Sequence, residues 1–149
     1  YYLFSAIGGA ILGLDYVLPA DEMKGVPLMD ARFDNCVIYG LSSDINIGDL
    51  TDSNVYLRNC LLKSAGEDDE HFLNCVWEGD PLFFTVREDY IFDYRLKNES
   101  HAINKGDKEL CPQSASIDRF GVNRFERDSV DIGAYVWVEQ IEENSKDGM

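Results

Sequence analysis

The chain contains 149 residues, of which 45% are hydrophobic and 12% aromatic, enough to form the core of one domain. Thirteen Lys and Arg residues stand against 28 Asp and Glu residues, so the formal net charge is -15. A surface this acidic repels the phosphates of nucleic acids and of anionic membranes, and it tolerates cations such as calcium. Composition therefore excludes disorder for most of the chain and argues against nucleic acid as a partner.

Residues 1–19 are mostly apolar, yet they match neither a membrane span nor a signal peptide. Asp15, three glycines and the lack of a basic segment argue against both. The glycines at 8, 9 and 13 instead divide this stretch into two or three short buried strands. We predict no membrane insertion within this chain. Because the chain begins at Tyr1 rather than Met, we expect a fragment or a processed product, and any export signal would lie upstream.

A phrase of six residues occurs three times in the first half of the chain. It consists of a large apolar residue, any residue, Asn-Cys and two apolar residues, and its copies are residues 33–38, 57–62 and 72–77. We call these copies the Asn-Cys phrases. Their steps of 24 and 15 positions are too short for a two-helix repeat and are typical of strand-turn-strand coils stacked on one another. The repeat predicts an all-β solenoid whose coils occupy residues 1–79.

The order of residues within the phrase predicts which side chains point inward. We expect the first apolar residue and the Cys to face the interior, and the Asn to take the bend, because Asn tolerates a left-handed backbone. Stacked strands lie about 4.8 Å apart, so equivalent positions become neighbours. The Asn amides would bond along one ladder, and the cysteines would form a second ladder of buried thiols. These ladder residues are Asn35, Asn59, Asn74, Cys36, Cys60 and Cys75.

The outward positions of the phrases pair opposite charges. In this register Asp34 lies over Arg58, and Lys63 lies over Glu78. Each exposed pair contributes only a few tenths of a kcal/mol, but together they support the alignment. Acid–base catalysis on an extended substrate needs several unpaired acids and bases on one outer face. Because these four residues already pair with one another, we predict no catalytic site within this chain.

One predicted outward column is apolar, and the repeat ends soon after it. Val37, Leu61 and Val76 would point outward, so we expect another segment or a partner to cover them. From Gly79 the repeat stops. Residues 80–138 have the size and irregularity of a C-terminal coil and cap, which a solenoid needs because its last coil exposes unpaired backbone. Residues 139–149 are predicted to be a polar tail.

Metal and ligand sites have weaker signals. The four cysteines are too few for a disulfide scaffold, the spacing of Cys and His residues is unlike that of a zinc site, and the redox state of Cys111 stays open. The acidic run at residues 67–70 lacks the alternation and glycine of calcium loops. It predicts a solvated turn, so we predict no cofactor, with calcium as the one ion left open.

Sugar rings stack on exposed aromatic side chains, and polar neighbours fix their hydroxyl groups. The candidate ligand-binding residues are therefore Tyr39, Tyr56, Lys63 and Glu78. In the predicted cap, Asp118, Arg124 and Asp131 indicate a structural clasp, since one Arg can bridge two carboxylates.

Five further motifs follow the Asn-Cys phrases. They are Asp80-Pro81-Leu82-Phe83, Asp93-Tyr94-x-Leu96, Ser100-x-Ala102-Ile103-x-x-Gly106, Asp118-x-x-Gly121-x-x-Arg124 and Asp131-Ile132-Gly133-Ala134-Tyr135. Over residues 31–138 the chain resembles the C-terminal part of exported bacterial right-handed parallel β-helix proteins, whose shared ending is called the choice-of-anchor Q region. His101 stands where that family usually has proline, and Val136 where it usually has glutamate.

The resemblance implies a right-handed parallel β-helix of the pectate-lyase type. It also implies an exported protein, either on the bacterial cell surface or anchored as an outer-membrane lipoprotein. It implies polysaccharide or a surface protein as partner, without a fixed reaction. We therefore expect a non-catalytic end segment of an exported surface protein that binds glycan or a surface partner. The alternative is part of a polysaccharide lyase or glycoside hydrolase with its active face upstream of residue 1. A structural piece of a larger assembly is the third candidate.

Overall fold

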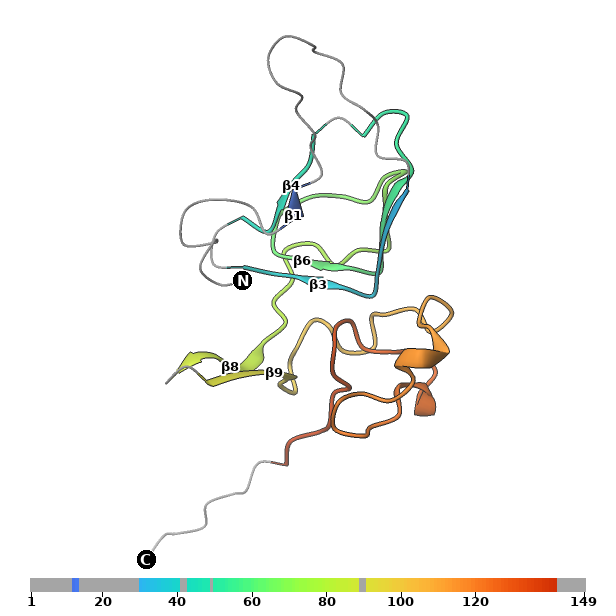
Figure 1. The fold of residues 1–149 in the computed structure, drawn as a ribbon. Coiled ribbons are helices and arrows are strands. Elements are labelled where there is room, and N and C mark those ends of the chain that lie inside the picture. The colour runs from blue at the N-terminus through green and yellow to red at the C-terminus, as the bar shows by residue number, and fades with distance from the viewer. Residues whose placement is uncertain (1–11, 14–29, 41–42, 49, 89–90, 142–149) are drawn as a thin grey trace, which may run out of the picture.

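The computed structural model describes residues 12–13, 30–40, 43–48, 50–88 and 91–141 (Figure 1). This part of the chain is all-β, with short strands, two 3-10 helices and no α-helix. The strands are β1 (Leu12–Gly13), β2 (Ala31–Asp34), β3 (Val37–Ile38), β4 (Ile45–Asn46), β5 (Val55–Arg58), β6 (Leu61–Leu62), β7 (Phe72–Leu73), β8 (Phe83–Glu88) and β9 (Ile91–Leu96). The 3-10 helices are η1 (Gln113–Ala115) and η2 (Arg124–Glu126).

The strands of the Asn-Cys phrases pair in parallel, in the register that the repeat predicts. β2, β5 and β7 form one sheet, in which Phe33 is opposite Leu57 and Leu57 is opposite Phe72. β3 and β6 form a second sheet, and Val76 bridges to Leu61 beside it. These sheets are small, and Figure 1 shows their strands stacked side by side.

Each asparagine of the phrases turns the chain between two short strands. Asn35, Asn59 and Asn74 have φ values of 52°, 50° and 53°, which is the left-handed conformation that Asn tolerates better than most residues. The predicted bend at Asn is therefore confirmed. Because the turn recurs at the same place in each phrase, the strands on both sides of it stay in register.

The strand predicted around residue 45 is also present. β4 pairs in parallel with β1, and Asp44, just before it, is 1% exposed. Its carboxylate accepts hydrogen bonds from the backbone N–H groups of Lys63 (2.6 Å) and Ser64 (3.0 Å) and from the Ser64 hydroxyl. Burial alone would raise the pKa of Asp44, but these bonds outweigh it and hold the pKa below its usual value. The other strands predicted in residues 1–19 lie outside the described residues.

The apolar residues form two clusters, one on each side of the β3–β6 sheet. The first fills the space between the parallel sheets and consists of Ile38, Leu50, Val55, Leu57, Cys60, Leu62 and Phe72. The second joins Leu61 to Leu96, Ala102 and Ile132, with Val37 and Val76 packed against them. The outward apolar column is thus covered by another segment of the chain, as predicted, and that segment belongs to residues 80–138.

The covering segment approaches the phrases closely at Gly133. This residue has a φ of +104°, and a Cβ atom there would lie 3.0 Å from the Val37 side chain. Its N–H donates to the Asn35 carbonyl at 2.9 Å. Glycine is therefore needed at this position for both its backbone conformation and its small size.

Candidate functional site

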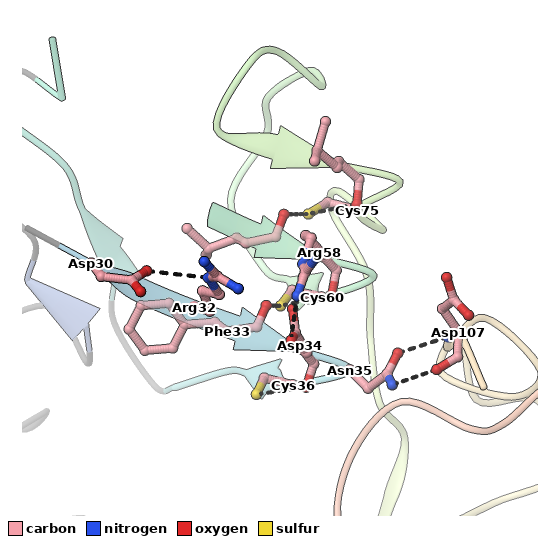
Figure 2. Close-up of polar contacts among 12 residues, drawn as sticks. Asp30, Arg32, Phe33, Asp34, Asn35, Cys36, Arg58, Cys60, Cys75 and Asp107 are labelled. Atoms are coloured by element: carbon pink, nitrogen blue, oxygen red, sulfur yellow. Dashed lines mark hydrogen bonds and ion pairs between the residues drawn. The ribbon is translucent and has the colours of Figure 1, made fainter. Parts of the chain in front are cut away.

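The three cysteines of the phrases occupy one inward column (Figure 2). Cys60 is fully buried, and Cys36 and Cys75 are half-buried. The Cys60 thiol donates to the Phe33 carbonyl at 3.2 Å, and the Cys75 thiol donates to the Leu57 carbonyl at 3.3 Å. Each of these thiols therefore bonds the first residue of the preceding phrase, which ties successive layers together.

The thiols of this cysteine column also affect one another. The hydrogen bond from Cys60 holds the pKa of Cys36 at about 7, below its ordinary value of 9.0, and the bond from Cys60 lowers the pKa of Cys75 as well. Hydrogen bonds with both neighbours, together with burial, raise the pKa of Cys60. Of the facing thiols Cys36 and Cys60, Cys36 is therefore the more readily ionised.

The Asn amides do not form the predicted ladder. Asn35 donates to the Asp107 carbonyl at 2.8 Å and accepts from the Asp107 N–H at 2.7 Å, as Figure 2 shows. Asn59 donates to the Lys105 carbonyl at 3.1 Å, and Asn74 is exposed. The left-handed turn directs these amides outward, where the irregular segment offers backbone groups that no strand pairs. The amides of Asn35 and Asn59 therefore attach residues 105–107 to the stack.

The two predicted charge pairs have different outcomes. Arg58 makes two hydrogen bonds of 2.7 Å to the Asp34 carboxylate, and their strands pair at these residues. Lys63 instead donates to the Gly40 carbonyl at 3.0 Å, and Glu78 is exposed in a left-handed turn. Among the described residues no ion pair joins Lys63 to Glu78, because the chain turns at Glu78 and its N–H bonds the Ser64 carbonyl.

Of the four candidate ligand-binding residues, Tyr39 and Lys63 lie together and Tyr56 lies on the sheet of β2, β5 and β7. Tyr39 packs against the second apolar cluster, and the Lys63 ammonium lies 5.7 Å from its ring centre. Burial and the nearby Asp80 raise the pKa of Tyr39. Tyr56 lies on β5 with its ring 6.1 Å from that of His71. The structure therefore brings Tyr39 and Lys63 together but not Tyr56.

The predicted clasp has a different construction. Asp118 is 8% exposed, and its carboxylate accepts from the N–H groups of Phe120 (2.8 Å), Val122 (2.9 Å) and Val136 (3.0 Å). Arg124 donates to the carbonyls of Gly133 and Ala134 rather than to a carboxylate. The prediction that Arg124 bridges two carboxylates is thus wrong, since the irregular backbone supplies partners for each charged group separately.

Of the two aspartates in the predicted clasp, Asp131 lies beside an arginine, which is Arg127 rather than Arg124. It is 4% exposed and accepts from the N–H groups of Asn104 (2.8 Å) and Trp137 (2.7 Å). Arg127 lies 3.6 Å from it, donates to the Trp137 carbonyl, and stacks 4.9 Å from the Trp137 ring centre. Asp131, Arg127 and Trp137 therefore hold the end of the covering segment.

A groove that the sequence did not indicate lies between the β8–β9 hairpin and the C-terminal segment. Its volume is about 270 Å³. The Arg95 guanidinium lies between the rings of Phe84 (5.1 Å) and Phe120 (5.2 Å), and Phe120 is 61% exposed. Polar groups line it too, among them Glu139 and Gln140. The one sequence signal for this Arg95 groove is an aromatic residue in the polar turn before Gly121.

The acidic run forms an exposed turn, as predicted, but it also has bonding partners. Asp69 accepts from the N–H groups of His71 (2.7 Å) and Phe72 (2.9 Å). Asp68 accepts from the Cys75 N–H and the Trp77 indole, both at 3.1 Å. Within the described ranges no group of three or more His, Cys, Asp or Glu residues is arranged to hold a metal ion.

Two further observations concern membrane spans and similarity to known proteins. None of the helices in the described part of the chain has the length and apolar content needed to cross a bilayer. No protein family model, no curated protein and no solved structure matches the chain.

Proposed function

We propose that this chain is the non-catalytic end segment of an exported bacterial surface protein with a right-handed parallel β-helix, and that it binds glycan. The parallel register of the three Asn-Cys phrases supports the β-helix, because equivalent strands stack on one another with an asparagine turn at one corner. In this proposal residues 1–79 form coils, residues 80–138 form the last coil and cap, and residues 139–149 form a tail.

The observation that carries glycan binding is the Arg95 groove. The C–H faces of sugar rings pack on aromatic side chains, and the exposed Phe120 ring presents such a surface. Arg95, Glu139 and Gln140 place polar groups beside it. A shallow groove with one aromatic wall and several polar groups fits a short stretch of polysaccharide.

The charges around the groove favour a neutral glycan over a polyuronate. The Arg95 guanidinium is already bonded to the Asp93 carboxylate at 2.5 Å, so its charge is not available to an acidic sugar. Glu139 adds a negative charge to the lining, and the whole chain carries -15. An acidic polysaccharide would therefore be repelled.

The alternative, part of a polysaccharide lyase or glycoside hydrolase, has less support from these residues. Arg58, one of the candidate bases, is held by both oxygens of Asp34. In this alternative the active face lies on coils upstream of residue 1.

Binding of neutral and acidic polysaccharides, measured with and without calcium, tests the proposal. We expect neutral glycans to bind and Phe120→Ala to weaken binding about threefold to tenfold, the loss of one stacking contact. Ile117→Ala is the control, because Ile117 is 53% exposed but does not line the groove. Equal binding by both variants would contradict the groove. New reducing ends or unsaturated products would favour the enzyme.

A further inference from the structure

We propose that the cysteine column is an oxidation site, in which Cys36 and Cys60 form a disulfide when hydrogen peroxide reaches them. The site is independent of the glycan groove, since it lies inside the stack of phrases. The fourth cysteine of the chain, Cys111, is not part of an Asn-Cys phrase and lies outside the column.

The backbone places these two cysteines in adjacent layers. Asp34 is opposite Arg58, and Val37 is opposite Leu61, so Cys36 and Cys60 face each other across the same turn. The Leu61 N–H donates to the Cys36 carbonyl at 2.9 Å. Paired strands are about 4.8 Å apart, which falls within the Cα separation of about 4.4–6.8 Å found in disulfides.

The sulfur atoms of this pair lie closer to their shared strand than those of Cys60 and Cys75. Cys36 Sγ and Cys60 Sγ each lie 3.2 Å from a carbonyl of β2, those of Asp34 and Phe33. Both sulfur atoms therefore contact adjacent residues of one strand, as Figure 2 shows. The sulfur atoms of Cys60 and Cys75 lie against β5 in the same arrangement but at longer distances, 3.6 Å to the Arg58 carbonyl and 3.3 Å to the Leu57 carbonyl. The closer contacts of Cys36 and Cys60 favour their pairing.

The chemistry needs one nucleophilic thiolate and one thiol that resolves the product. Cys36, with a pKa of about 7, supplies the thiolate. It attacks one peroxide oxygen, the O–O bond breaks, and Cys36 sulfenic acid and hydroxide form. The Cys60 sulfur then attacks the sulfenic sulfur, an S–S bond replaces the S–O bond, and the thiol proton leaves with the hydroxyl group as water. Two thiols and one peroxide thus give one disulfide and two waters.

The experiment treats the folded full chain with one equivalent of hydrogen peroxide, then labels free thiols after denaturation and maps the peptides by mass. We expect the four thiols to fall to two, with a crosslink between the peptides that contain Cys36 and Cys60. A crosslink confined to Cys60 and Cys75, or four intact thiols, would overturn the proposal.

Variants separate the column from chance reactivity. Cys75→Ala and Cys111→Ala should keep the crosslink. Cys60→Ser should lose it and leave a Cys36 sulfenic acid that dimedone traps, because the Ser hydroxyl keeps a hydrogen-bond donor beside Cys36. The same oxidation in urea is the folding control, because an unfolded chain has no preferred pair. If the unfolded chain gave the same crosslink with the same yield, the folded column would not be its cause.

Discussion

Residues 30–79 and residues 80–141 satisfy their backbone hydrogen-bonding groups in different ways. In the first region strands bond to strands across successive layers, as when the Val76 N–H donates to the Cys60 carbonyl. In the second region, outside the β8–β9 hairpin, side chains also accept backbone N–H groups from distant loops, above all the carboxylates of Asp118 and Asp131. The repeated region therefore draws its order from register, and the irregular region depends on single charged side chains.

The contact between the two regions should be the most sensitive point of the molecule. Leu61 is fully buried and lies against Leu96, Ala102 and Ile132 of the irregular region. Leu61→Ala should lower the free energy of unfolding by about 3–5 kcal/mol, the range for a buried Leu that leaves a cavity. Leu73→Ala, at a side chain 37% exposed, is the control. Urea unfolding of both variants measures the difference, and equal losses would contradict the contact.

Asp131→Ala should disturb the irregular region and leave the repeat in place. It removes the acceptor for the Asn104 and Trp137 N–H groups and the partner of Arg127. Buried donors without partners cost about 1–3 kcal/mol each. Because these two are only partly buried, the lower end applies to each, and we expect a loss of about 2–3 kcal/mol. Amide hydrogen exchange should rise near residues 104 and 137 and stay unchanged in β5. A uniform rise along the chain would remove the distinction between the regions.

Two asparagines of the phrases provide a matched pair. Asn35→Gly and Asn74→Gly both keep the left-handed turn, but only Asn35 bonds the irregular region, through Asp107. We expect Asn35→Gly to cost about 1–2 kcal/mol more than Asn74→Gly, the value of two hydrogen bonds. Thermal unfolding of the two variants gives the comparison. The same melting temperature for both would mean that the amide bonds contribute nothing.

The smallest effect is expected at Asp44, within the repeated region. Its pKa in the folded chain lies below the ordinary 3.8, so its charged form stabilises the fold above that pH. This contribution is lost as the pH falls through the lower, folded pKa. Asp44→Asn removes the charge but keeps one acceptor oxygen, so it should lower stability at neutral pH only by the amount that the ionised carboxylate contributes, and flatten the acid dependence below about pH 4. An unchanged acid limb in unfolding curves would rule out this role.

The repeat made the parallel register predictable, because Asn-Cys recurs at positions that the backbone must align. It also predicted the left-handed asparagines and the cover over Leu61. The partners of Arg124 and of the Asn35 amide were not predictable in this way. Each depends on which distant backbone groups an irregular segment leaves unpaired, and sequence spacing carries little information about that. The Arg95 groove was not predicted for the same reason, since the rings of Phe84 and Phe120 both come to lie against Arg95 only in the folded chain.

The bonds of the acidic turn have a consequence for self-association. β7 is the last strand of its sheet and is only two residues long. A free strand edge invites another chain to add to it, yet Asp68 and Asp69 already occupy the N–H groups of His71, Phe72 and Cys75. An approaching strand would have to displace carboxylates and enter a negative field. The turn at residues 67–70 thus disfavours the pairing of another chain with the edge strand β7.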